Sequence, residues 1–300
     1  MKMTGPQKAF QVFNVVLLLL LCIITLYPFL YILALSFNDG LDALRGGIWL
    51  LPRKLTFDNY LAAFQEPNIV NSFVISISRT LIGTVASVIL LSMQAYAMSD
   101  KALPGRRFLT KYFFFTTLFG GGIIPTFILL RSLNLINNYW VYILPALYGF
   151  YNFIIMRTSF ESMPASIEES ARIDGAGDMR VYWQFVMPLN KPILATVALF
   201  TGVFHWNDWY AGTFYVRSQA LKPAATLLRD VLAEATFESG SVSSMYNAMQ
   251  TDFAVAAQTT TTPQALQMAF VVIITVPILL VYPFLQKHFV KGALIGSIKE

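Results

Sequence analysis

The sequence is poor in charge, cysteine and histidine. Only 12% of its 300 residues are charged, whereas soluble domains carry about 25%. It contains one cysteine, Cys22, and two histidines, His205 and His288, which are far apart along the chain. An intrachain disulfide is therefore impossible, and the Cys and His spacings that hold structural metals are missing. We expect no metal ion and no other cofactor in this chain.

Motifs that carry chemistry are missing as well. The sequence has no glycine-rich loop ending in Lys-Ser or Lys-Thr, so it does not bind ATP through the usual phosphate-binding loop. No grouping of Ser, His and Asp indicates an activated nucleophile. The net charge of +5 is spread between apolar segments rather than gathered into one basic patch. We therefore expect neither an enzyme nor a nucleic-acid-binding protein.

Long apolar runs, by contrast, are abundant. Hydrophobic residues make up 56% of the chain and the mean hydropathy is +0.59, which indicates a polytopic membrane protein in contact with lipid. Residues 10–37 contain no charge and can cross a hydrocarbon core about 30 Å thick. This run is too long for a signal peptide, whose apolar region has about 7–15 residues. We predict six spans, at residues 10–37, 70–98, 112–130, 139–157, 189–210 and 264–286.

The distribution of Lys and Arg predicts the orientation of these spans. If the N-terminus is inside, the inner segments hold 13 of the 21 basic residues and the outer segments hold 7. An excess of Lys and Arg in short loops marks the cytoplasmic side. We therefore expect both termini in the cytoplasm, the polar segment 166–188 inside, and residues 205–209 at the outer surface.

Two spans carry unusual residues, and each allows two interpretations. Arg79 lies in the second span, where an arginine is either a contact near a transport pathway or a buried hydrogen-bonding anchor. The third span contains three consecutive glycines and Pro125, which weaken a helix. A broken helix in a transporter marks a substrate site near the middle of the membrane, but the same residues also make an ordinary kink.

The segment from Ser166 to Pro192 is the one long charged stretch between two apolar spans. It must lie outside the bilayer, because one charge at the bilayer centre costs about 3 kcal/mol. Ser166 and Glu169 have the spacing of a capping box, and Gly175 is suited to end a helix. We predict a helix of about ten residues and a second one starting near Asp178. These features alone are also compatible with an ordinary capped surface helix.

The same segment resembles the signature loop of ABC importer permeases. That loop reads E-A-A, three residues, G, a nine-residue spacer and I-x-L-P, and here E-S-A-R-I-D-G-A at 169–176 is followed by F-V-M-P-L at 185–189. The departures at the second Ala, the Ile and the Leu of the pattern are conservative. The Asp-Gly-Ala form resembles the carbohydrate, or maltose-type, branch. The stretches at 120–126, 154–160 and 205–209 resemble the subgroup that carries oligosaccharides such as alginate and aldouronate.

The resemblance implies an all-α membrane protein with six transmembrane helices and a cytoplasmic coupling helix, the fold of ABC type I importer permeases. Residues 1–300 would form a single permease domain in a bacterial cytoplasmic membrane. Its partners would be a second homologous permease, a dimer of ABC ATPases that binds ATP and Mg, and an extracytoplasmic solute-binding protein. Glu169 would orient the docked coupling helix and Gly175 would permit the turn after it. The implied coupling residues are Ser166, Glu169, Ala171, Asp174, Gly175 and Pro188.

A second group of residues predicts a path for a sugar, and an oligosaccharide in particular. Its aromatic rings suit stacking on sugar rings, and its polar side chains suit hydrogen bonds to hydroxyl groups. Aromatic residues near the end of a span are, however, also common membrane-interface anchors. In maltose-type systems the sugar rests mainly on the partner permease, so this chain would form one wall. The group comprises Gly121, Gly122, Tyr148, Tyr151, Asn152, His205, Trp206, Asn207, Asp208 and Trp209.

Three other functions fit the sequence less well. An ion-coupled secondary transporter needs carboxylates within its spans, and the predicted spans have only Asp208, near one end. A membrane-embedded enzyme needs clustered His, Asp or Glu at the membrane surface, which two distant histidines do not provide. A permease for an amino acid or a metal remains open, and an uptake assay that compares sugars with amino acids would separate it from a sugar permease.

Overall fold

The computed structural model describes the backbone of residues 5–240 and 261–297, and the side chains of 6–233, 261–281 and 283. Within these ranges the chain is built from helices, without a strand, so the predicted all-α fold is confirmed. One isolated antiparallel bridge joins Asn38 to Leu55. The residues fall into two compact units, drawn from Met1–Ile69 with Leu228–Val276 and from Val70–Leu227 with Pro277–Glu300.

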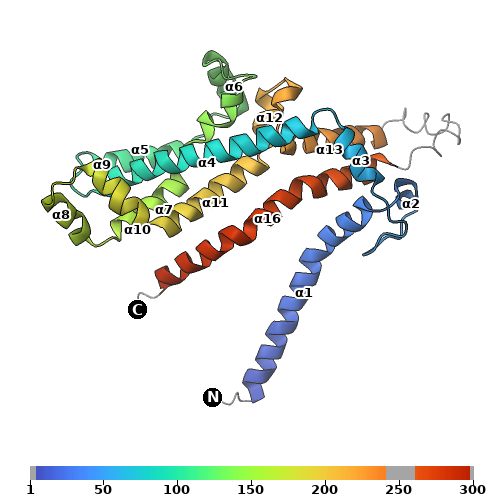
Figure 1. Ribbon diagram of the computed structural model, residues 1–300, viewed down its shortest axis with the longest axis horizontal. Coiled ribbons are helices and arrows are strands. Elements are labelled where there is room, and N and C mark those ends of the chain that lie inside the picture. The colour runs from blue at the N-terminus through green and yellow to red at the C-terminus, as the bar shows by residue number, and fades with distance from the viewer. Residues whose placement is uncertain (1–4, 241–260, 298–300) are drawn as a thin grey trace. The chain divides into compact units, whose positions relative to one another are not determined.

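The first unit is dominated by α1 (Gly5–Ser36), the long blue helix of Figure 1. Its apolar side chains are exposed almost all round, from Phe10 to Leu30, because the run in sequence has no polar face to turn to water. Apolar surface of this extent requires a lipid or protein cover. Pro6–Ser36 is long and apolar enough to cross a membrane.

The chain after α1 is held by a cluster of hydrogen-bonded polar side chains. It contains α2 (Gly40–Leu44) and α3 (Asp58–Gln65). The buried Asn38 side chain donates to Asp42 Oδ2 at 3.1 Å and accepts from the backbone amides of Arg53 and Lys54 at 2.8 and 3.0 Å. The Asn38 amide and the Arg53 guanidinium hold the pKa of the Asp42 carboxyl below its usual range. The Asn59 side chain completes this cluster by donating to the backbone carbonyls of residues 36 and 38.

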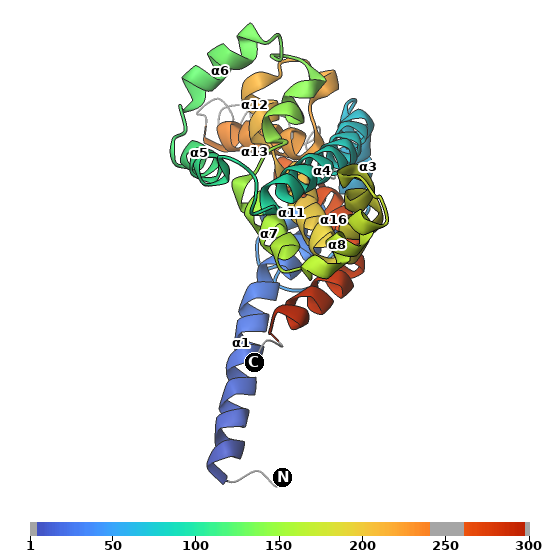
Figure 2. The ribbon, with the colours of Figure 1, turned by 90° about the vertical axis from the view of Figure 1, so that its left-hand side faces the viewer.

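The second unit is organised around α4 (Ile69–Ser99), which runs beside α7 (Phe150–Glu161) and α11 (Lys191–Asn207) (Figures 1 and 2). Apolar residues recurring along these helices form the main core, which includes Leu91, Ala95, Phe153, Met156 and Val197. A smaller core joins α6 (Ile123–Ser132), η1 (Tyr139–Tyr142) and α12 (Tyr210–Tyr215).

Three apolar helices are long enough to span a membrane alone: Pro6–Ser36, Ile69–Ser99 and Pro263–Val281. The last is part of α16 (Pro263–Ser297), which follows α13 (Ala224–Gly240). Three further spans exist only if each of three bent helix pairs counts as one. The described residues therefore hold three to six spans by length and composition, and the count of six stays a prediction.

The bent pairs confirm that the third span is interrupted at its glycines, and they correct the fourth and fifth spans, for which we predicted no break. The third is α5 (Arg106–Leu118) followed by α6, with a bend of 115° at the glycine run. The fourth begins with the 3₁₀ turns η1 and η2 (Leu144–Ala146) before α7, at a bend of 48°. Glycine and proline have the lowest helix propensities, so the breaks fall where these residues occur.

The fifth span, predicted at 189–210, lies in a longer bent pair. It comprises α9 (Asp178–Val181), the π-helical turn η3 (Tyr182–Val186) and α10 (Met187–Leu189), then α11 after a bend of 81°. The helix ends at Asn207 rather than at 210. The reason is Asp208, whose Oδ1 accepts from the backbone amides of Tyr210 and Ala211 at 3.0 and 3.3 Å and so starts α12.

A close approach between α4 and α11 provides a test of this packing. A Cβ added to Gly83 would lie 2.4 Å from His205 Nε2, and His205 is only 1% exposed and has little room to move. We expect Gly83→Ala to lower the free energy of unfolding by about 1–3 kcal/mol, as overpacking does. An SDS titration in mixed micelles measures this change. Gly202→Ala is the control, because its Cβ would meet Thr84 Oγ1 at 3.4 Å; equal stabilities of the two variants would contradict the packing.

Candidate functional site

The charged segment forms α8 (Ala165–Ile173), placed between α7 and α9. The N-cap lies two residues earlier than predicted. It is Pro164, without a side-chain cap, and the Ile167 amide donates to the Pro164 carbonyl at 3.2 Å. Ser166 is thus inside the first turn, and the predicted capping box of Ser166 and Glu169 is wrong. The φ of Pro164, −61°, lets the chain enter the helix directly and leaves the serine no capping position.

The end of α8 agrees with the prediction. Gly175 has φ +81°, and its amide donates to the Arg172 carbonyl at 3.0 Å. The Ala176 amide donates to the Ala171 carbonyl at 2.9 Å, which completes a Schellman motif with Asp174 as the C-cap. Only glycine adopts this left-handed conformation without steric cost.

The two faces of α8 differ sharply. Ala171 is 4% exposed and belongs to the main core with Met98, Phe160 and Val181. On the opposite face Glu169 is exposed and Ile173 is 86% exposed. A large apolar side chain this exposed on a charged, water-facing helix suggests a surface that a partner protein covers. The helix is therefore anchored through one small residue and free to bind along the other face.

Charged groups tie α8 to α9. Arg172 Nη2 lies 2.8 Å from Asp178 Oδ1, and this carboxylate is the main reason that the pKa of Arg172 lies above its usual value. Partial burial raises the pKa of the Glu168 carboxyl, although Arg172 opposes the shift. Asp178 is the first residue of α9, whose N-cap is Gly177, so the predicted second helix starts where expected.

The chain after α9 is fastened to the core helices. Tyr182 and Ser92 of α4 share a hydrogen bond of 2.7 Å between their hydroxyl oxygens. Ser159 of α7 donates to Asn190 Oδ1 at 2.8 Å, just before α11. Pro188, assigned to the coupling residues from the sequence, is exposed within the short helix α10 between these two contacts.

A buried ion pair joins Arg79, in the first half of α4, to Asp208, the C-cap of α11. The Arg79 side chain is 0% exposed, and its Nη1 lies 3.3 Å from Asp208 Oδ2. Its Nη2 donates to the Asp208 carbonyl, and its guanidinium lies 5.0 Å from the centre of the Tyr142 ring. The structure therefore supports the interpretation of Arg79 as a buried anchor. We did not predict the pairing, although a lone carboxylate near the end of another span was its available signal.

The residues predicted to line a sugar path divide into an exposed group and a group that is buried (His205) or half-buried (Tyr148, Asn152, Trp206 and Asp208). His205 packs against Gly83, Tyr148 packs against the main core, and Asn152 Nδ2 lies 3.4 Å from Thr201 Oγ1 of α11. The Trp206 ring lies 6.4 Å from that of Phe73. The exposed members are Gly121, Gly122, Tyr151, Asn207 and Trp209. A role for either group in a path stays a prediction.

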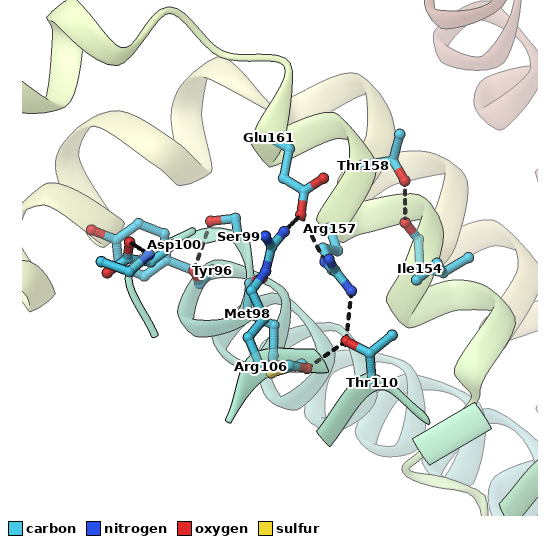
Figure 3. A network of polar contacts seen from close by, with 11 residues as sticks. Tyr96, Met98, Ser99, Asp100, Arg106, Thr110, Ile154, Arg157, Thr158 and Glu161 are labelled. Carbon is cyan, nitrogen blue, oxygen red and sulfur yellow. Dashed lines mark hydrogen bonds and ion pairs between the residues drawn. The ribbon is translucent and has the colours of Figure 1, made fainter. Parts of the chain in front are cut away.

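One polar cluster was not predicted from the sequence. Arg106, Arg157 and Glu161 meet where α4, α5 and α7 end or begin (Figure 3). The available signal was the spacing of Arg157 and Glu161, which are one helical turn apart. Among the residues that the structure describes, three or more His, Cys, Asp or Glu never gather as they would around a metal ion.

Together these features define a multi-pass helical membrane protein that presents one capped, amphipathic helix to water. No family model matches the chain. Protein LplC of Bacillus subtilis (strain 168) is 36% identical over 296 residues, which are 99% of this chain and 97% of LplC. The polygalacturonan/rhamnogalacturonan transport system permease protein YtcP of the same strain is 37% identical over 282 residues, 94% of this chain and 95% of YtcP.

A solved structure agrees with these relatives. It is a bacterial ABC transporter involved in the import of the acidic polysaccharide alginate. One of its chains matches with a TM-score of 0.86 and 30% identity, over 96% of this chain and 99% of that chain. The chain therefore belongs to the permease subunits of ABC sugar importers. It is a transport subunit and not an enzyme: ATP hydrolysis belongs to a separate ATPase, and a substrate-binding protein is a further partner.

Proposed function

We propose that this chain forms one wall of the import path for an oligosaccharide and couples that path to ATP hydrolysis through α8. The single observation that carries the coupling role is the pair of faces on α8. Ala171 is buried in the core of the permease, while Ile173 and Glu169 on the opposite face are exposed. A helix anchored on one side and exposed on the other can transmit the movement of a docked partner.

The coupling residues act in different ways. Ala171 anchors α8, Asp174 and Gly175 form its C-terminal cap, and Glu169 faces the docked ATPase. Ser166 lies in the first turn at the exposed surface, and Pro188 begins the passage back into the membrane. ATP and Mg bind to the ATPase subunits, and closure of the ATPase dimer moves α8.

The functional unit is a heterodimer with a second, homologous permease, together with two ATPases and an extracytoplasmic solute-binding protein. The chain forms a single permease domain with six spans in the cytoplasmic membrane of a bacterium. Both termini lie in the cytoplasm, which the distribution of Lys and Arg along the sequence favours. On this orientation α8 is cytoplasmic, and the end of α11 with Asp208 is at the outer surface.

The substrate follows from the relatives and from the aromatic residues. YtcP is a permease of a polygalacturonan/rhamnogalacturonan transport system, and the solved structure is involved in the import of alginate. Tyr151 and Trp209 are 68% and 43% exposed, and aromatic rings of this kind stack on sugar rings. Gly121 and Gly122 leave backbone groups accessible at the break between α5 and α6.

A co-purification from detergent-solubilised native membranes tests the proposed assembly. We expect mass spectrometry to find an ATPase and a second permease with this chain. Uptake into liposomes that hold the purified complex then tests the substrate, with oligogalacturonates, galactooligosaccharides and amino acids compared. Uptake of amino acids alone would replace the sugar with the main alternative, and isolation of the folded chain without an ATPase would contradict the coupling role of α8.

A further inference from the structure

A cluster of charged side chains joins three helices at the end of α7 that leads into α8. The Glu161 carboxylate, on the last residue of α7, accepts from Arg106 of α5 and, at 2.8 Å, from Arg157 Nε on its own helix (Figure 3). Arg157 Nη1 donates to Thr110 Oγ1 of α5 at 2.9 Å. Arg106 Nε donates to the Met98 carbonyl, in the last turn of α4, at 2.8 Å. Glu161 thus connects α7 to Arg106 of α5, and Arg106 in turn connects to the end of α4.

The position of Arg106 is unfavourable for its own helix. Arg106 is the first residue of α5, and the N-terminus of a helix carries partial positive charge. A cation is favoured instead at a helix C-terminus, and Arg106 reaches the last turn of α4 through the Met98 carbonyl. The side chain therefore serves the contact between helices rather than the stability of α5.

The cluster lies next to the N-terminal end of α8. Glu161 is followed by Ser162, the C-cap of α7, and then by Pro164, the N-cap of α8. The other end of α8 is closed by its Schellman motif, and the chain that follows is held by the hydrogen bond between the hydroxyls of Tyr182 in η3 and Ser92 of α4. Ala171 also packs in the main core with Met98 of α4. Without the cluster, α8 would keep these contacts, but the turn between α7 and α8 would lose its link to the start of α5 and the end of α4.

We propose that Glu161, Arg106 and Arg157 are positioning residues that make the N-terminal end of α8 move together with α4 and α5. This inference rests on the proposed coupling role of α8. The three side chains are 28%, 19% and 14% exposed. Charge pairs that remain this accessible to water contribute little to stability, so their main effect is on how movement of α8 reaches the spans.

Glu161→Gln in the complete complex, reconstituted in liposomes with the solute-binding protein, tests the role. The amide keeps the size of the side chain but removes the charge that both guanidinium groups share. We expect sugar uptake per ATP hydrolysed to fall about fivefold, the order expected for one or two partly exposed charge pairs. ATP hydrolysis without binding protein, complex assembly and thermal stability should stay at wild-type values. The matched control is Arg107→Gln, which removes the exposed neighbouring charge and should change none of these quantities.

A covalent link separates a mechanical role from a merely structural one. Arg106→Cys and Glu161→Cys are combined with Cys22→Ala, which removes the natural thiol. Each maleimide ring forms one C–S bond by addition of a thiol across its double bond, so a short bismaleimide ties α5 to the end of α7. We expect the bismaleimide to restore uptake per ATP and a monofunctional maleimide to leave it low.

The outcomes distinguish this inference from the proposed function on which it rests. If a Gly175 variant uncouples transport but Glu161→Gln transports like wild type, the positioning role alone is overturned. Reduced assembly or stability of Glu161→Gln, without rescue by the cross-link, also overturns it, because the residue is then only structural. If the Gly175 variant and Glu161→Gln both transport normally, the coupling role of α8 itself is wrong.

Discussion

Gly175→Asp is expected to abolish sugar uptake while the chain still inserts, folds and assembles. Gly175 has φ +81°, and a Cβ added there would have nothing within 4 Å in this chain. The cost to the fold is therefore only that of a left-handed backbone, about 1–2 kcal/mol and less for Asp or Asn than for most residues. The new carboxylate projects from the exposed end of α8, where the ATPase docks on our proposal.

The size of this effect follows from the interface. A charge buried against a partner without a counterion costs about 2–5 kcal/mol, and about 1.4 kcal/mol already corresponds to a tenfold change. We therefore expect uptake into liposomes to fall more than tenfold, with ATP hydrolysis no longer stimulated by the solute-binding protein. Basal hydrolysis and co-purification of the partner permease should persist.

Two matched variants separate charge from conformation at this position. Gly175→Asn has the same shape as the Asp variant without its charge, and we expect an intermediate loss of uptake. Gly177→Asp adds the same charge two residues away, where φ is −74° and a Cβ again meets nothing within 4 Å. Aspartate is a favoured N-cap, so this variant should transport nearly normally. Normal uptake by Gly175→Asp would rule out docking at this end of α8.

Asp208→Asn is expected to cause the largest loss of stability of any single substitution proposed for this chain. The change leaves the fully buried Arg79 guanidinium without a carboxylate. Removing one partner of a buried ion pair costs about 3–5 kcal/mol, because the other charge stays buried and unpaired. The free energy of unfolding from an SDS titration in mixed micelles measures this loss, in parallel with the fraction of protein that remains monodisperse after heating.

Removing Arg79 instead of Asp208 should lower the free energy of unfolding by less. The difference between the two losses tests whether the buried, unpaired arginine is the cause. Arg79→Met leaves the Asp208 carboxylate, which is 16% exposed and keeps its hydrogen bonds to the start of α12. We expect a loss of about 1–2 kcal/mol, because a polar group that retains partners and some water is cheaper to leave behind. The double variant should resemble Arg79→Met rather than the sum of the two losses. Additive losses would show that the pair is not coupled.

Hydropathy predicted where the long helices lie, because the apolar length needed to cross a membrane is a local property of the sequence. The predicted spans at 10–37 and 70–98 agree closely with the apolar helices Pro6–Ser36 and Ile69–Ser99. Hydropathy did not predict the bends of the other helix pairs. A window average reads the stretch 112–130 as one apolar run, whereas the glycines within it break the helix by 115°.

The preferences of residues for helix ends predicted where α8 ends, but not where it starts. Gly175 ends the helix as expected, since a left-handed residue is a requirement that glycine alone meets without steric cost. The start was displaced because Pro164 directs the chain into the helix, so that Ser166, a good capping residue, is already inside it. Capping preference is weaker than the path imposed by the preceding α7.

The sequence by itself determined that this chain is a helical membrane protein, which part of it faces water, and which family it resembles. These properties depend on composition, on charge distribution and on a motif within about twenty-five neighbouring residues, all of which are local. Only the tertiary structure decided that Arg79 binds Asp208, 129 residues away, and that Arg106 binds both Glu161 of α7 and the Met98 carbonyl of α4. Such partners depend on how separate helices pack, and a single sequence records the residues but not their proximity.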